Sequence, residues 1–82
     1  MTHMINAQVN VTAVRFRADL ETVPSRIEYG GRSYTFVDSG IRYLIRRGEH
    51  MVRLLDMSDG HSKFRLRYED ELSGWQLLSI GS

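Results

Sequence analysis

The chain has 82 residues, no cysteine, 26% charged residues and a net charge of +1 at neutral pH. The length indicates one domain, residues 1–82, and the absence of cysteine excludes disulfides, thiolate nucleophiles and cysteine-ligated zinc. The net charge is too small to attract nucleic acid to the molecule as a whole. A small secreted domain usually needs disulfides, so their absence favours the cytoplasm. We find no signal peptide and no membrane-spanning run, and we expect no membrane partner.

Turn-forming residues divide the chain into short segments, from Pro24 near the start to Gly74 near the end. Short segments between such signals are typical of all-β folds. We therefore predict six or seven antiparallel strands in a meander, which closes into a small barrel or forms a curved sheet. Residues 1–4 resemble a cloning remnant, and we expect them to form a disordered tail.

The N-terminal segment, "AQVNVTAVRFRAD", has the composition of a strand, but its alternation changes phase. Val9 and Val11 occupy odd positions, whereas Val14 and Phe16 occupy even ones. Two structures explain such a change. One is a β-bulge near residues 12–13, and the other is a strand that passes from one layer of the fold to another.

The segment "SRIEYGGRSYTF" predicts a hairpin that turns at residues 30–31. Gly-Gly suits a two-residue turn because both residues adopt positive φ without strain. Pattern and turn agree, since this register places the apolar residues together on one face. The predicted pairs are Tyr29 with Arg32, Ile27 with Tyr34 and Ser25 with Phe36.

Residues 40–56 fit two alternatives. A turn at Gly48 and Glu49 makes a hairpin that pairs Ile45 with Val52, and Tyr43 with Leu54. The same apolar residues also fall at helical spacing, which would make the fold α+β. A helix would carry Gly48 in its interior, at a cost of about 1 kcal/mol relative to Ala. We therefore favour the hairpin.

The next strand pair also has two registers. A two-residue turn at Asp59-Gly60 pairs Leu55 with Phe64, whereas a three-residue loop pairs Leu54 with Phe64. Only the three-residue loop keeps Leu54 on the face chosen by the preceding hairpin, so we predict that loop. The last segment then places Trp75 beside Tyr68 and Leu77 beside Leu66.

These registers predict a core face and a basic face on the same strands. The predicted core face comprises Tyr43, Ile45, Val52, Leu54, Phe64, Leu66, Tyr68, Trp75 and Leu77. The predicted basic face comprises Arg42, Arg46, Arg53, Lys63, Arg65 and Arg67, with Leu44, Met51 and Leu55 among them. These six cations are our candidate contact residues.

No pattern in the sequence indicates catalysis or a cofactor. His50 and His61 lie at predicted turns, and no serine lies in a G-x-S-x-G elbow. The segment "DMSDGHS" resembles a calcium loop, but its glycine is at the fifth place rather than the sixth. We therefore predict a protein that is not an enzyme and that binds no metal or small-molecule cofactor.

The basic face has three interpretations. Arg and Met are enriched at protein interfaces and Lys is depleted, and ten of the eleven cations here are Arg. We therefore rank a module that binds a protein partner, or associates with itself, first. The alternative is a nucleic-acid-binding barrel whose Arg residues contact phosphates. The third interpretation is a solvated face, on which Arg side chains cover apolar neighbours.

Overall fold

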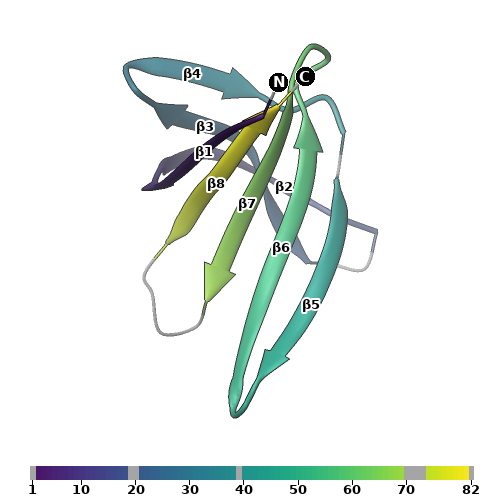
Figure 1. Ribbon diagram of the computed structural model, residues 1–82. Helices are drawn as coiled ribbons and strands as arrows, with labels where there is room; N and C mark the ends of the chain where they lie inside the picture. The colour runs from purple at the N-terminus through teal and green to yellow at the C-terminus, as the bar shows by residue number, and fades with distance from the viewer. Residues whose placement is uncertain (1, 19–20, 39, 70–73, 82) are drawn as a thin grey trace.

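The computed structural model describes residues 2–18, 21–38, 40–69 and 74–81. These residues form eight strands in two antiparallel sheets and contain no helix, which confirms the all-β prediction and gives the hairpin at residues 40–56. The five-stranded sheet has the order β1-β8-β7-β6-β5, and the three-stranded sheet has the order β2-β3-β4. Figure 1 shows β2 crossing behind the five-stranded sheet. The strands are β1 (His3–Gln8), β2 (Asn10–Phe16), β3 (Thr22–Tyr29), β4 (Arg32–Thr35), β5 (Ile41–Arg47), β6 (His50–Ser58), β7 (Lys63–Glu69) and β8 (Trp75–Gly81).

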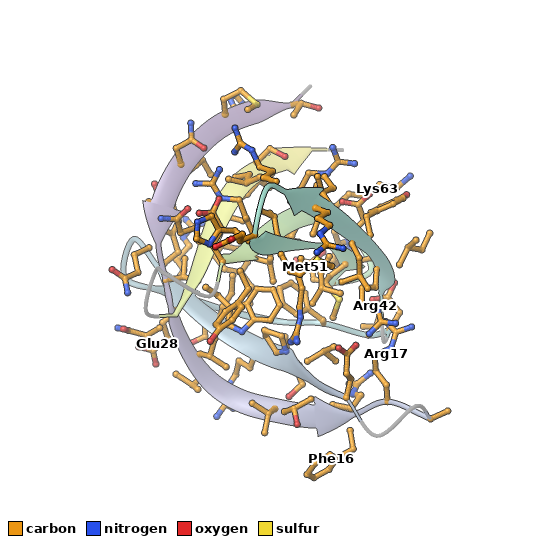
Figure 2. The ribbon with its side chains drawn as sticks, turned by 90° about the horizontal axis from the view of Figure 1, so that it is seen from below. Phe16, Arg17, Glu28, Arg42, Met51 and Lys63 are labelled. Carbon is orange, nitrogen blue, oxygen red and sulfur yellow. The ribbon has the colours of Figure 1, made fainter. Side chains whose placement is uncertain are left out.

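The N-terminal segment supplies two strands, which is why the structure has eight strands rather than six or seven. The chain passes from the five-stranded sheet to the three-stranded sheet at Val9, whose N–H donates to the carbonyl of Trp75 at 3.1 Å. Figure 2 shows β1 and β2 as one curved ribbon along both sheets. The register of β2 also shifts between Val11 and Val14. A bulge and a passage between layers are therefore both present, but they do not turn the even-numbered residues inward, since Val14 and Phe16 are 57% and 73% exposed.

The prediction that residues 1–4 form a disordered tail is wrong for His3 and Met4. Strand β1 begins at His3, which pairs with Ile80, and Met4 pairs with Ser79. Both residues therefore pair with β8, although the Met4 side chain remains exposed.

The β3–β4 hairpin has the predicted register. Gly30 and Gly31 adopt φ values of +61° and +77°, as a type I′ turn requires. Ile27 pairs with Tyr34 and is completely buried. Beyond the end of β4, the N–H of Phe36 donates to the Ser25 carbonyl at 2.9 Å, which continues the same register.

The hydrophobic core lies between the two sheets. Phe64 of the large sheet packs against Phe36 and Tyr34 of the small one, with ring centroids 5.2 and 5.1 Å apart. Burial of each such ring stabilises the fold by about 1.5–3 kcal/mol. The buried cluster comprises Val9, Val23, Ile27, Phe36, Leu55, Met57, Phe64, Leu66 and Leu77.

The predicted three-residue loop between β6 and β7 is wrong. The loop has four residues, 59–62, and pairs Met57 with Phe64 and Leu55 with Leu66. Asp59 closes this longer loop by accepting hydrogen bonds from the N–H groups of His61 and Ser62 at 2.9 and 2.7 Å. Phe64 is therefore three positions from its predicted partner. An odd shift exchanges the faces of β7 and β8 relative to β5 and β6.

The β5–β6 hairpin has its predicted register, with Ile45 paired to Val52 and Tyr43 to Leu54. Gly48 has a φ of +63° at the first position of the two-residue loop, as a type II′ turn requires. Strand β5 is the last strand of the large sheet. The hairpin extends beyond the neighbouring strands, so the small sheet does not cover its tip (Figure 1).

Candidate protein interface

The six predicted contact residues lie on two faces of the large sheet. Arg42 pairs with the buried Leu55, so Arg42 lies on the core side of the sheet. Arg46 and Arg53 share this inner face by alternation. The remaining three cations alternate with buried Phe64 and Leu66, and therefore lie on the outer face. The register of β6 and β7 thus divides the predicted basic face. The outer cations are Lys63, Arg65 and Arg67.

Two of the inner cations, Arg42 and Arg53, contact Glu21, which directly precedes β3. The Glu21 carboxylate forms an ion pair with Arg42 and lies 3.8 Å from a guanidinium nitrogen of Arg53. The Arg53 guanidinium also lies 5.9 Å from the ring centre of Tyr68. Figure 2 shows Arg42 and Arg17 at the same rim of the two sheets, where Arg17 donates to the Gly40 carbonyl at 3.3 Å. This cluster joins the sheets.

Two of the outer cations have acceptors within the chain. Arg65 donates two hydrogen bonds to the carboxylate of Asp56, and these bonds raise the pKa of Arg65 above its usual value. Arg67 donates to the side-chain oxygen of Gln76 at 3.0 Å and lies 3.7 Å from the carboxylate of Glu69. Their positive charges are therefore partly compensated.

The outer face also carries an apolar patch. Four of its five residues were predicted to be core, and of these four only Val52 is buried. We define the outer patch as Tyr43, Ile45, Val52, Leu54 and Leu78. Two shallow grooves cross it. One has a volume of about 630 Å³ and is lined by Tyr43, Ile45, Leu54 and Arg65 among others. The second has a volume of about 290 Å³ and lies over Val52 and Leu78, beside Arg67.

Exposed apolar side chains concentrate on the β5–β6 hairpin. Of nine exposed large hydrophobic residues in the described part of the chain, five lie between positions 41 and 51. They occupy both faces, since Leu44 and Met51 are on the inner side and the others on the outer side. Single exposed apolar residues are normal on a protein surface, so the unusual feature here is their concentration on one hairpin. The five residues are Ile41, Tyr43, Leu44, Ile45 and Met51.

Sequence reasoning found the cations of this hairpin but assigned Tyr43 and Ile45 to the core. The available signal was that β5 carries apolar residues at both odd and even positions, as Leu44 lies between Tyr43 and Ile45. A strand that is apolar on both faces does not have to lie in the interior. The topology places β5 at the edge of the sheet, where six of its seven residues are exposed.

Comparison with known proteins gives no relative: no family model, curated protein or solved structure matches the chain. Within residues 2–18, 21–38, 40–69 and 74–81, no three His, Cys, Asp or Glu side chains gather as metal ligands would. The same residues include no helix long and apolar enough to cross a membrane.

Proposed function

We propose that this protein is a small non-catalytic module that binds a protein partner in the cytoplasm through its β5–β6 hairpin. The observation that supports this function is the clustering of five exposed apolar residues on one hairpin. Arg42, Arg46 and Arg53 on the same hairpin supply cations around the apolar residues. Aromatic, Met and Arg side chains around an apolar centre make up the composition of protein interfaces.

Nucleic-acid binding is the weaker candidate because it needs several cations on one surface. Here three of the predicted contacts lie on each face of the sheet. Arg42, Arg65 and Arg67 also form ion pairs with carboxylates of the same chain. A phosphate would have to compete with these carboxylates, which reduces the favourable release of counterions.

Site-specific photocrosslinking in the cells that produce the protein tests the proposal. A photoreactive amino acid replaces Leu44 on the hairpin, and a matched variant carries it at Ser33, which is exposed on the small sheet. We expect a discrete protein adduct from position 44 and none from position 33. Mass spectrometry then identifies the adduct as another protein or as a second copy of this chain. Equal labelling from both positions contradicts the proposal.

A nucleic-acid titration tests the alternative directly. Labelled single- and double-stranded DNA and RNA are added at low and at moderate salt. The protein-partner proposal predicts weak binding that does not depend on the sequence of the nucleic acid. Tight binding that weakens steeply with salt, together with nuclease-sensitive adducts at position 44, would replace it with the nucleic-acid function.

A further inference from the structure

We infer that β5 accepts an extended segment of the partner protein as a sixth strand of the large sheet, and that apolar and acidic side chains alternate along this segment. The inference rests on the proposed function and specifies the form of the partner. Strand β5 has seven residues, Ile41–Arg47, and lies at the end of the sheet. Strand addition to such an edge is a common way to bind extended peptides.

The backbone of β5 has hydrogen-bonding groups directed away from β6. In a hairpin with a two-residue loop, the residues that flank the loop form a hydrogen-bonded pair, here Arg47 and His50. Such pairs alternate along an antiparallel ladder. The N–H and C=O groups of Arg42, Leu44 and Arg46 therefore point toward the open edge. An added strand can pair with Leu44 and Arg46.

The other three sheet edges are less suited to strand addition. Strand β1 has an irregular register between Met4 and Ala7, and Asn6 there has a positive φ of 55°. Strand β2 has a register shift between Val11 and Val14. Strand β4 has only four residues. Bulges and short length are features that block edge pairing. By contrast, the β5–β6 pairing is regular over all seven residues of β5.

The side chains of β5 determine which segment fits. On the outer face the edge presents Ile41, Tyr43 and Ile45, next to the larger groove. On the inner face it presents Leu44 between Arg42 and Arg46. Opposite charges that face each other across strands are favourable, as are aromatic and β-branched pairs. The partner segment therefore places apolar side chains on the outer face and carboxylates on the inner face.

A second copy of this chain is a poorer occupant of the same edge. If β5 pairs antiparallel with β5 of a second copy and Leu44 faces Leu44, then Arg42 of each copy faces Arg46 of the other. A pairing centred on Tyr43 makes the two Arg42 side chains diagonal neighbours. Like charges at such distances destabilise a strand pair. Arg42 already pairs with Glu21. Arg46, whose guanidinium donates to the Gly48 carbonyl rather than to a carboxylate, can attract an acidic segment, so charge favours a different protein over self-association.

The probe for the test is a fluorescent heptapeptide in which Glu and Val alternate, matched in length to β5. Fluorescence anisotropy measures its binding to the intact protein. We expect saturable binding that falls about tenfold when alternate peptide amides are N-methylated, because those amides pair with β5. A heptapeptide of Lys and Val should bind at least tenfold more weakly. Absence of saturable binding at millimolar peptide, or equal binding of the methylated peptide, overturns the inference.

Two protein variants locate the binding edge. Leu44→Pro removes an N–H that points away from β6, so the hairpin ladder is retained while the edge loses a donor. Arg46→Glu reverses an edge charge, and Lys63→Glu on the outer face of β7 is its matched control. We expect the first two variants to weaken Glu/Val peptide binding about tenfold and the control to leave it unchanged. Circular dichroism verifies that each variant folds.

The outcomes separate this inference from the proposed function. Adducts to another protein at position 44, together with no effect of N-methylation or of Leu44→Pro, leave the hairpin as an interface but overturn strand addition. A dimer in sedimentation experiments that Leu44→Pro dissociates also overturns it, because the edge is then occupied by a second copy. Absence of adducts from the hairpin contradicts the proposed function itself.

Discussion

The carboxylate of Asp56 accepts two hydrogen bonds from Arg65 across the β6–β7 pair, at 2.7 and 2.8 Å. Both side chains are partly exposed, at 30% and 47%, so solvent screens most of their attraction. We expect Asp56→Asn to lower the free energy of unfolding by about 0.5 kcal/mol at low salt. Urea unfolding at two salt concentrations measures the change. The loss should shrink at high salt, and a loss above about 2 kcal/mol would contradict this.

Glu21 contacts two guanidinium groups and lies where the sheets meet. Its removal should therefore lower the free energy of unfolding more than Asp56→Asn does. Glu21→Gln leaves Arg42 and Arg53 close together without the carboxylate between them. We expect a loss of about 1 kcal/mol in the free energy of unfolding. Glu28→Gln is the matched control, because Glu28 is an exposed carboxylate near the other end of β3. Equal losses for the two variants would show that the cluster does not join the sheets.

Gly40 precedes β5 and is required there for two reasons. Its φ is +75°, and an added Cβ would lie 2.2 Å from the sulfur of Met57 and 3.0 Å from the Asp56 carbonyl. We expect Gly40→Ala to cost about 3 kcal/mol or more, from left-handed strain and a core displacement together. Gly48→Ala isolates the strain, since nothing lies within 4 Å of its Cβ. It should cost only about 1–2 kcal/mol.

A double-mutant cycle checks why Gly40→Ala should cost more stability than Gly48→Ala. If the Met57 side chain is the obstacle, Gly40→Ala should cost less in a Met57→Ala background than in the natural protein. Thermal or urea unfolding of the four proteins gives the coupling energy. An unchanged cost would assign the effect to the backbone contact with Asp56 instead.

Sequence reasoning predicted the two hairpins that have two-residue turns with glycine, and their registers were correct. Gly30 and Gly48 supply the positive φ that each two-residue turn requires, and one register then follows from the alternation. The β7–β8 pairing was also correct, with Tyr68 beside Trp75 and Leu66 beside Leu77. The register was predicted correctly wherever the turn residues and the alternation of apolar residues indicated the same pairing.

The β6–β7 register could not be obtained in this way because β6 is apolar on both faces. Val52 and Leu54 alternate on one side, and Leu55 and Met57 on the other. A pattern specifies register only when one face is clearly buried. The hydrogen bonds of Asp59 and the position of the small sheet determine the β6–β7 register, and the spacing of apolar residues reveals neither of them. The division of the basic face follows from this one register.

The loop that sets this register gives the last prediction. Asp59 accepts hydrogen bonds from the N–H groups of Ser62 and His61, at 2.7 and 2.9 Å. The bond from Ser62 is the largest reason why the pKa of Asp59 lies below its usual value of 3.8. Asp59→Ala removes Oδ1, the oxygen that accepts both hydrogen bonds, and we expect it to lower the free energy of unfolding by about 1 kcal/mol at neutral pH.

The pH dependence of this loss has a definite sign. Because folding lowers the pKa of Asp59, the unfolded chain binds the proton more tightly than the folded protein does. The stabilisation is therefore complete above the unfolded pKa of about 4, and it disappears as pH falls through the lower folded pKa. The stability difference between the natural protein and Asp59→Ala should thus be constant from about pH 5 to 7 and shrink below about pH 4. Urea unfolding across this range measures it, with Asp56→Asn as a second carboxylate variant outside the loop. A difference that stays constant into strong acid would show that the carboxylate charge does not hold the four-residue loop.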